Sequence, residues 1–242
     1  MNIDRHQIEI GEIVVEVVRK EIKNLHVGVY PPAGRVRVAA PLHLDNDAVR
    51  LAVISRLGWI LRKQKEFRKQ DRQSQREMVS GESHYFQGHR YILDVVEREG
   101  VPTILLRNNR TMEIRVRPGT GRDQREAVLQ RWYRRQLRAL LPPLLEKWEP
   151  KVGKRASEVR IKKMKTRWGS CNIEARRIWL NLELIKKPVS CLEYVLVHEL
   201  VHLHERHHTE RFQDLLEALI PTWRLHREEL NRAPLAHEEW AY

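Results

Sequence analysis

Histidine and glutamate side chains meet in one short stretch of the chain, His198-Glu199-Leu200-Val201-His202. On a helix, residues four apart lie about one turn from each other on the same face, so the two imidazoles can share one Zn²⁺ ion. Zinc lowers the pKa of a bound water to about 7, and a neighbouring carboxylate can then accept its proton. The spacing therefore predicts a zinc-dependent hydrolytic centre with Glu199 as the general base.

The same five-residue pattern occurs a second time, from His204 to His208. Apolar residues surround the first match almost completely, so its helix is expected to be buried and its polar side chains need a partner. The second match lies in a run of charged residues and histidines, where water can satisfy each side chain. We therefore assign the metal to the first match.

A catalytic zinc ion usually has three protein ligands and one open position. We predict His208 as the third ligand, because the chain can leave the helix after His202 and return to the metal before His208. His207 is the nearest alternative. Glu205 is another, either as a ligand or as a hydrogen-bond partner of one. A continued helix would point His204 about 200° away from His202, so it is expected to face solvent.

Periodicity predicts the elements that carry these residues. A long helix is expected from Asp123, with Pro142 and Pro143 kinking or ending its first half. Ser190 and Glu193 match a capping box that opens a helix over residues 191–205. Short strands are expected over residues 159–164 and 177–181, and a further helix over 211–220, with a polar tail to residue 242.

Alternating apolar and polar residues near the start of the chain predict a small antiparallel sheet. Asp45 can cap a helix that continues into the charged run 62–76. No internal repeat is evident. The expected strands of the first half cover residues 8–18, 25–30, 35–39, 91–96, 103–106 and 112–116.

These patterns together predict an α+β fold with two domains. Residues 1–120 are expected to form an N-terminal antiparallel β-rich domain with a helix. Residues 121–242 then form a second domain that carries the metal site.

A second motif runs from Met164 to Asn172 with the sequence Met-Lys-Thr-Arg-Trp-Gly-Ser-Cys-Asn. Together with strand 177–181, the first histidine motif and His208, it resembles the YgjP-like metal-dependent hydrolases, a zincin-type group similar to the SprT-like metalloproteases. The resemblance extends to Gly58-Trp59-Ile60, to the segment around Gly88 and to the helix around Trp132.

The resemblance implies a zincin-like C-terminal hydrolase domain that binds one zinc ion per chain. It implies His198, His202 and His208 as the metal ligands and Glu199 as the catalytic acid/base. The chain departs from the family pattern on the substrate side. Members often have Phe-Trp four residues after the third histidine, whereas here Gln213 follows Phe212. His207 occupies a position that is often asparagine or another polar residue.

Arg167 is the predicted substrate-binding residue, because its guanidinium can steady an oxyanion or a substrate phosphate; the alternative is a structural ion pair. Trp168 and Gly169 are expected to shape a tight turn against the helix that carries the metal ligands. Cys171 is expected to be a buried thiol rather than a nucleophile or a zinc ligand.

Composition narrows the choice of partners. The chain has 45 Lys and Arg against 32 Asp and Glu, a net charge of +13 that attracts polyanions. The first hypothesis is a zinc peptidase acting on peptide or protein, and the alternative is a nucleoside triphosphate pyrophosphohydrolase using the same site. A nucleic-acid-binding module with a structural metal is the third, although such a site would normally need four protein ligands.

Cellular location is suggested by two further observations. Cys171 and Cys191 are too few for a disulfide framework, which favours a reducing cytoplasm. No apolar stretch is long enough to predict a membrane span or a secretion signal, so we expect no membrane partner.

Overall fold

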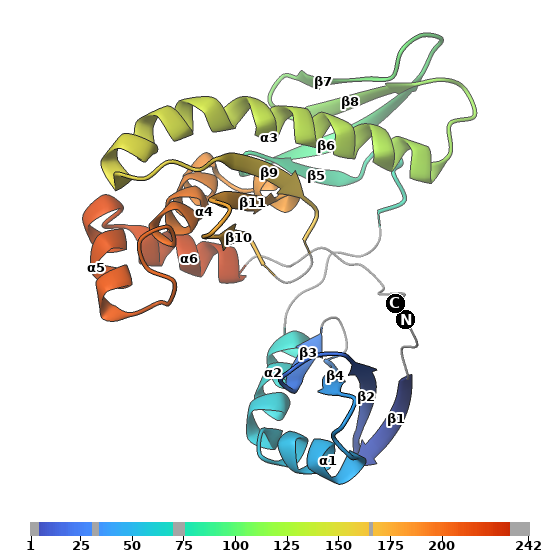
Figure 1. The fold of residues 1–242 in the computed structure, drawn as a ribbon. Helices are drawn as coiled ribbons and strands as arrows, with labels where there is room; N and C mark the ends of the chain where they lie inside the picture. The colour runs from blue at the N-terminus through green and yellow to red at the C-terminus, as the bar shows by residue number, and fades with distance from the viewer. Residues whose placement is uncertain (1–4, 31–33, 70–75, 165–166, 233–242) are drawn as a thin grey trace. The chain divides into compact units, whose positions relative to one another are not determined.

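A computed structural model describes residues 5–30, 34–69, 76–164 and 167–232. The chain has the predicted α+β fold, with small sheets and helices in both halves (Figure 1). Its contacts divide it into two compact units, with the division between Gln73 and Ser74. The first unit carries the N-terminal sheet, and the second carries every residue of the predicted metal site.

The first unit contains a four-stranded sheet of mixed direction. Its order is β1-β2-β4-β3, and β2 pairs with β4 in parallel, so the predicted purely antiparallel sheet is wrong. The β3–β4 hairpin joins the sheet through β4 because the buried Val36 and Val38 of β4 pair with the buried Val15 and Val17 of β2. The strands are β1 (Arg5–Ile10), β2 (Ile13–Lys20), β3 (His26–Tyr30) and β4 (Arg35–Pro41).

Two helices come after this sheet where the sequence predicted one. Asp45 caps α1 (Asn46–Ile54) as expected, and its side chain accepts a hydrogen bond from the Ala48 amide at 2.7 Å. The helix ends after Ile54, and α2 (Leu57–Lys69) begins after a two-residue break. The rest of the predicted charged helical face, from residue 70 to 75, lies outside the described residues.

The second unit begins with another four-stranded sheet. Its order is β5-β6-β8-β7, with β6 and β8 parallel and the two outer pairs antiparallel. The first sheet has the same arrangement, so the structure contains a topological repeat that the sequence does not reveal. The strands are β5 (Ser83–Phe86), β6 (His89–Glu97), β7 (Thr103–Arg107) and β8 (Thr111–Val116).

Helix α3 (Arg122–Val152) runs along this sheet and on past a third sheet (Figure 1). The sequence predicted that Pro142 and Pro143 kink or end the helix; both lie inside α3, so the helix does not end there. Proline removes backbone donors, but buried Leu137 and Leu141 before the pair and buried Trp148 after it anchor both sides. The third sheet has the order β10-β11-β9 and consists of β9 (Glu158–Lys162), β10 (Gly169–Asn172) and β11 (Arg177–Asn181).

One hydrophobic core joins the second sheet, α3 and the C-terminal helices. Met112 and Ile114 of β8 belong to the same buried cluster as Leu196 and Leu200 near the metal site. In addition, the amides of Gln87 and Gly88 donate to the carbonyls of Ile185 and Lys186 at 2.8 and 3.1 Å. Because this core is shared, the division at residues 73 and 74 differs from the predicted boundary near residue 120.

Short helices complete the second unit: η1 (Leu182–Lys186), α4 (Val189–Val201), α5 (Glu210–Leu219) and α6 (Trp223–Arg232). The predicted capping box of α4 is absent, since Pro188 precedes the helix and the Glu193 carboxylate accepts from Trp148 Nε1 at 2.6 Å instead. Helix α4 also ends at Val201, short of the predicted residue 205. Helix α6 lies in the segment predicted to be a polar tail.

Crossing a bilayer requires a helix that is both long and apolar. Among the described residues, no helix combines these two properties.

Candidate metal centre

Three imidazoles converge at the C-terminal end of α4. His198 lies in the last turn of this helix, His202 is its C-cap residue, and His208 lies in the loop before α5. One ring nitrogen from each lies within 4.8 Å of the other two. The Nε2 atoms of His198 and His208 are 3.0 Å apart. The structure therefore brings together the three residues predicted as ligands.

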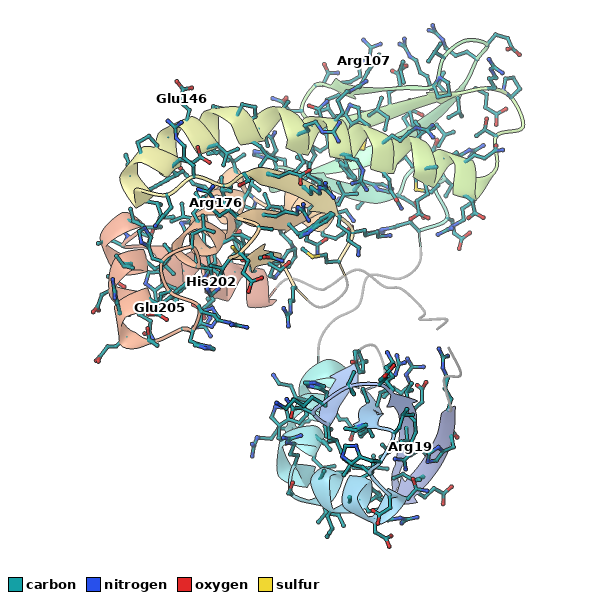
Figure 2. All side chains as sticks on the ribbon, in the orientation of Figure 1. Arg19, Arg107, Glu146, Arg176, His202 and Glu205 are labelled. Carbon is teal, nitrogen blue, oxygen red and sulfur yellow. The ribbon has the colours of Figure 1, made fainter. Side chains whose placement is uncertain are left out.

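The loop after α4 turns back through its own hydrogen bonds. Nδ1 of His202 donates to the carbonyl of Glu205 at 3.1 Å, and the carboxylate of Glu205 accepts from the amide of His207 at 3.3 Å. Thr209 then caps α5, where its hydroxyl accepts from the Phe212 amide. His202 and Glu205 both lie in the C-terminal helical part of the second unit (Figure 2). Glu205 thus orients a predicted ligand through its backbone carbonyl.

Phe212 packs against all three imidazoles. The centroid of its ring lies 4.9 Å from that of His198, 4.7 Å from that of His202 and 4.8 Å from that of His208. The Phe212 side chain is 1% exposed, so it forms a fixed apolar wall behind the rings. The sequence predicted that Phe212 lies near the start of this helix. It did not predict the contact of Phe212 with the imidazoles, because that contact depends on how α5 packs against α4.

The electrostatics favour the neutral form of these histidines. Burial lowers the pKa of His198 to about 3, with His202 and His208 adding to the effect. Burial also lowers the pKa of His202 and of His208. Neutral imidazole is the form that donates a lone pair to a metal. Since Nδ1 of His202 carries the proton that bonds Glu205, its Nε2 lone pair is available.

The spacing also fits a small divalent cation. Tetrahedral zinc with Zn–N distances of about 2.0–2.1 Å separates two ligand nitrogens by about 3.3 Å. The 3.0 Å between the Nε2 atoms of His198 and His208 is close to this separation. A hydrogen bond between His198 and His208 accounts for only one pair of rings. Each neutral imidazole also has an acceptor nitrogen, and three such rings packed together leave acceptors that need a partner, as a cation would be.

Glu199 lies beside the cluster and is buried. Its side chain packs on the backbone of Gly169, where a Cβ atom would come within 2.8 Å of the Glu199 Cγ and 2.9 Å of its Cδ. Burial raises the pKa of Glu199 to about 8, and the positive charge of Arg167 opposes this rise. Gly169 is thus a residue of β10 that makes room for a carboxylate, a role beyond the tight turn predicted from the sequence.

Asn181 holds the loop that leads to Gly169. This buried side chain donates to the carbonyls of Met164 and Arg167 at 2.7 and 2.8 Å, and it accepts from the amides of Met164 and Glu183. Its own backbone amide donates to the carbonyl of Trp168. Sequence reasoning missed this role; the available signal was an asparagine at the end of an apolar strand, where a polar side chain has to find partners.

A cleft with a volume of about 1140 Å³ opens in front of the three imidazoles. The residues that line it include Arg167, Gly169, Cys171, Glu199 and the three histidines of the cluster. The predicted substrate-binding residue Arg167 therefore faces the same space as the predicted base. Cys171 is a free, half-buried thiol whose pKa is raised to about 11, mainly by burial.

Neither His204 nor the alternative ligands His207 and Glu205 belongs to the group whose ligand atoms lie together. His204 donates from Nε2 to the carbonyl of Val152 at the end of α3, at 2.7 Å. His207 is exposed, and the Glu205 carboxylate faces the backbone of its own loop. Among the described residues, the group that could hold a metal here consists of His198, His202 and His208.

Similarity to known proteins identifies the family of this chain. No curated protein matches the chain. Solved structures similar to it include the crystal structure of the metallopeptidase zymogen of Pyrococcus abyssi abylysin, which is 22% identical over 36% of this chain and 89% of that chain, with a TM-score of 0.34. The family model of the YgjP-like metallopeptidase domain matches residues 24–233. This match covers most of the chain and confirms the resemblance: the chain belongs to the YgjP-like metallopeptidase family.

Proposed function

We propose that the protein is a zinc-dependent peptidase in which His198, His202 and His208 hold the ion and Glu199 is the general base. The observation that carries this proposal is the convergence of three neutral imidazoles beside one buried carboxylate. Membership of a metallopeptidase family supports the metal and the peptide or protein substrate. A set of three imidazoles suits zinc, and one ion per chain accounts for all three.

When bound, the ion supplies Lewis acidity that activates water and polarises a carbonyl oxygen. Glu199 accepts the proton of the attacking water and delivers it to the leaving amine. The pKa of Glu199, raised to about 8 by burial, lies near neutral pH. Arg167 opposes this rise, and a cation at the histidines would lower the pKa of Glu199 in the same way. The contact with Gly169 holds the carboxylate in position for both transfers.

Arg167 is proposed to bind substrate. Its side chain lines the cleft, and its backbone carbonyl is fixed by Asn181 at 2.8 Å. A guanidinium there can donate to a peptide carbonyl and stabilise the oxyanion that forms on attack. The net charge of +13 adds a general attraction for acidic substrates.

We further propose a reducing compartment, the cytoplasm, as the place of action. Both cysteines are free thiols in the structure, and Cys191 is fully buried.

The test measures metal content and hydrolysis separately. Purified protein is analysed for metal, then incubated with a protein mixture and, in parallel, with nucleoside triphosphates. We expect about one catalytic zinc per chain, new peptide N-termini, and no pyrophosphate. Glu199→Gln should keep the metal and lose at least about 100-fold in kcat, the contribution typical of a general base. Pyrophosphate release without new peptide ends would contradict the peptidase proposal.

A further inference from the structure

A second group of metal-binding side chains lies outside the three-histidine cluster. Cys191 comes from the first turn of α4, and His226 and Glu229 come from α6. One ligand atom from each residue lies within 4.8 Å of the other two. No part of the proposed hydrolytic mechanism uses these residues.

The packing of α4 against α6 creates this group. His226 and Glu229 are three residues apart on α6, so both project from one face of the helix. Cys191 Sγ donates to Glu229 Oε2 at 3.3 Å. The ring of His226 packs on Tyr194, with ring centroids 6.4 Å apart, and Tyr194 lies on α4 one turn after Cys191. The three side chains are therefore already gathered by the fold.

The chemistry of the three donors matches one class of ion. Thiolate, imidazole and carboxylate are the ligands that zinc takes in proteins. Zn–S of about 2.3 Å and Zn–O of about 2.0 Å place two tetrahedral ligands about 3.5 Å apart. The observed 3.3 Å between Cys191 Sγ and Glu229 Oε2 is close to this value. The group also has an open side, since Cys191 is buried but Glu229 is exposed and His226 half-buried.

Two charged groups face the cluster and tune its affinity. Lys187 interacts electrostatically with Cys191 and Glu229, so its ammonium competes with a bound cation. Glu193 interacts with His226, but its carboxylate also accepts from Lys147 and Trp148. Burial and the Glu229 carboxylate raise the pKa of Cys191 to about 12, so an ion has to displace the thiol proton. We therefore expect weaker binding than at three neutral imidazoles.

We propose that Cys191, His226 and Glu229 form a second site for zinc or a zinc-like divalent cation, which ties α6 to α4. Helix α4 carries His198 and Glu199 and is capped by His202, so an ion at this site holds the helix that positions them. The proposal does not depend on the peptidase activity.

Cobalt separates the two sites, because only a cysteine ligand gives a thiolate-to-cobalt charge-transfer band in the near ultraviolet. Metal-free full-length protein is titrated with Co²⁺. We expect two ions per chain and a thiolate band. The two cysteines provide matched variants: Cys191→Ser should lose the band and bind one ion, whereas Cys171→Ser should keep both.

Two further variants test each metal site separately. Glu229→Gln changes an exposed residue, so we expect it to leave the fold intact. It should weaken the Co²⁺ affinity of this site more than about 100-fold, because losing only an outer hydrogen-bond partner costs about 10–100-fold. His208→Ala should weaken the first site and keep the band, which separates this proposal from the catalytic one. Absence of the band in the unmodified protein, or its survival in Cys191→Ser, overturns the second site.

Discussion

The contact between Glu199 and Gly169 links two motifs that are far apart in the sequence. The carboxylate side chain fills the space that a Cβ atom on residue 169 would need. Glu199 is 5% exposed, and the backbone of Gly169 limits its position on the side that faces β10. The proposed base is thus positioned by the absence of a side chain on the strand opposite it.

Replacing Gly169 by alanine should therefore displace the proposed base. We expect Gly169→Ala to lower kcat/KM at least about 100-fold, as expected when a general base is misplaced. Zinc content should change little, since the three atoms nearest to an added Cβ at residue 169 all belong to Glu199 and not to a histidine. The comparison is Gly58→Ala in α2, where the nearest atom to an added Cβ is 3.8 Å away. Equal activity of both variants would show that the contact is unimportant.

His84 makes stability depend on pH. This residue is 6% exposed, and its pKa is lowered, first by burial and then by Arg76. The unfolded chain takes up a proton near the ordinary pKa of about 6.5, while folded His84 stays neutral to lower pH. Its contribution to stability is therefore fully present above about pH 6.5 and is lost as pH falls below it.

This dependence can be measured by urea unfolding between pH 5 and 7. We expect the free energy of unfolding to fall with decreasing pH in the unmodified protein. The slope should be shallower in His84→Gln, which does not titrate. Parallel slopes would mean that His84 ionises equally in both states.

Side chains that act through sequence spacing could be predicted, and those that act through tertiary contact could not. The helical spacing of His198 and His202 is local, and the return of the chain to His208 needs only a short loop. The wall formed by Phe212 and the room left by Gly169 depend on how α5 and β10 meet α4. No periodicity along the chain encodes such contacts.

At the scale of elements, Asn181 joins the end of β11 to the loop that leads into β10. Its buried amide bonds the carbonyls of Met164 and Arg167. We expect Asn181→Ala to lower the free energy of unfolding by about 2 kcal/mol or more, because several backbone groups, including the buried amide of Glu183, lose their partner. Activity should fall as well, since Gly169 and Arg167 lose their support.

The control for this change is Asn172→Ala. Asn172 is exposed, and its side chain accepts from a turn amide, that of Ala175, at 2.9 Å. Its replacement should cost less than about 1 kcal/mol. Denaturant midpoints of the two variants measure the difference. If both lose the same small amount, Asn181 does not anchor the loop.

The approximate positions of helices and strands could be predicted better than their exact ends or the pairing of the strands. The prolines of α3 and the expected capping box at Ser190 are local signals that tertiary packing overrides. Buried Trp148 anchors α3 beyond its prolines. The same indole donates to the Glu193 carboxylate, which the capping box would have used. Strand direction in the first sheet was misjudged because β4, not β3, supplies the buried residues that pair with β2. Adjacent strands in the sequence need not be adjacent in a sheet.

At the scale of the whole molecule, the shared core defines which part of the chain can fold alone. We expect a chain that begins at Ser74 to fold cooperatively and bind metal, because it keeps the entire cluster that contains β8, α3 and α4. A chain that begins at residue 121 loses Met112 and Ile114 and should not fold. Circular dichroism and thermal melting distinguish the two. A folded chain from residue 121 would support the boundary predicted from the sequence.

The two four-stranded sheets share one strand order in the two units. The fold class could be predicted from alternating patterns and helical periods, but this repeated order could not, because it rests on pairing between strands rather than on similar residues. The second sheet contributes a turn, at Gln87 and Gly88, that bonds the segment leading into α4. The same arrangement thus contributes to the metal site in one unit.

Helix α3 also sets a constraint on how the chain can change in length. Its 31 residues extend about 46 Å, and each added residue rotates the downstream part of the helix by about 100°. Trp132 meets Phe86 in its first half and Trp148 meets Glu193 in its second. A single inserted residue between them would turn one of these contacts away from its partner, whereas about seven, close to two turns, would restore the phase. In related chains, insertions should therefore occur in the connecting loops rather than in the middle of α3.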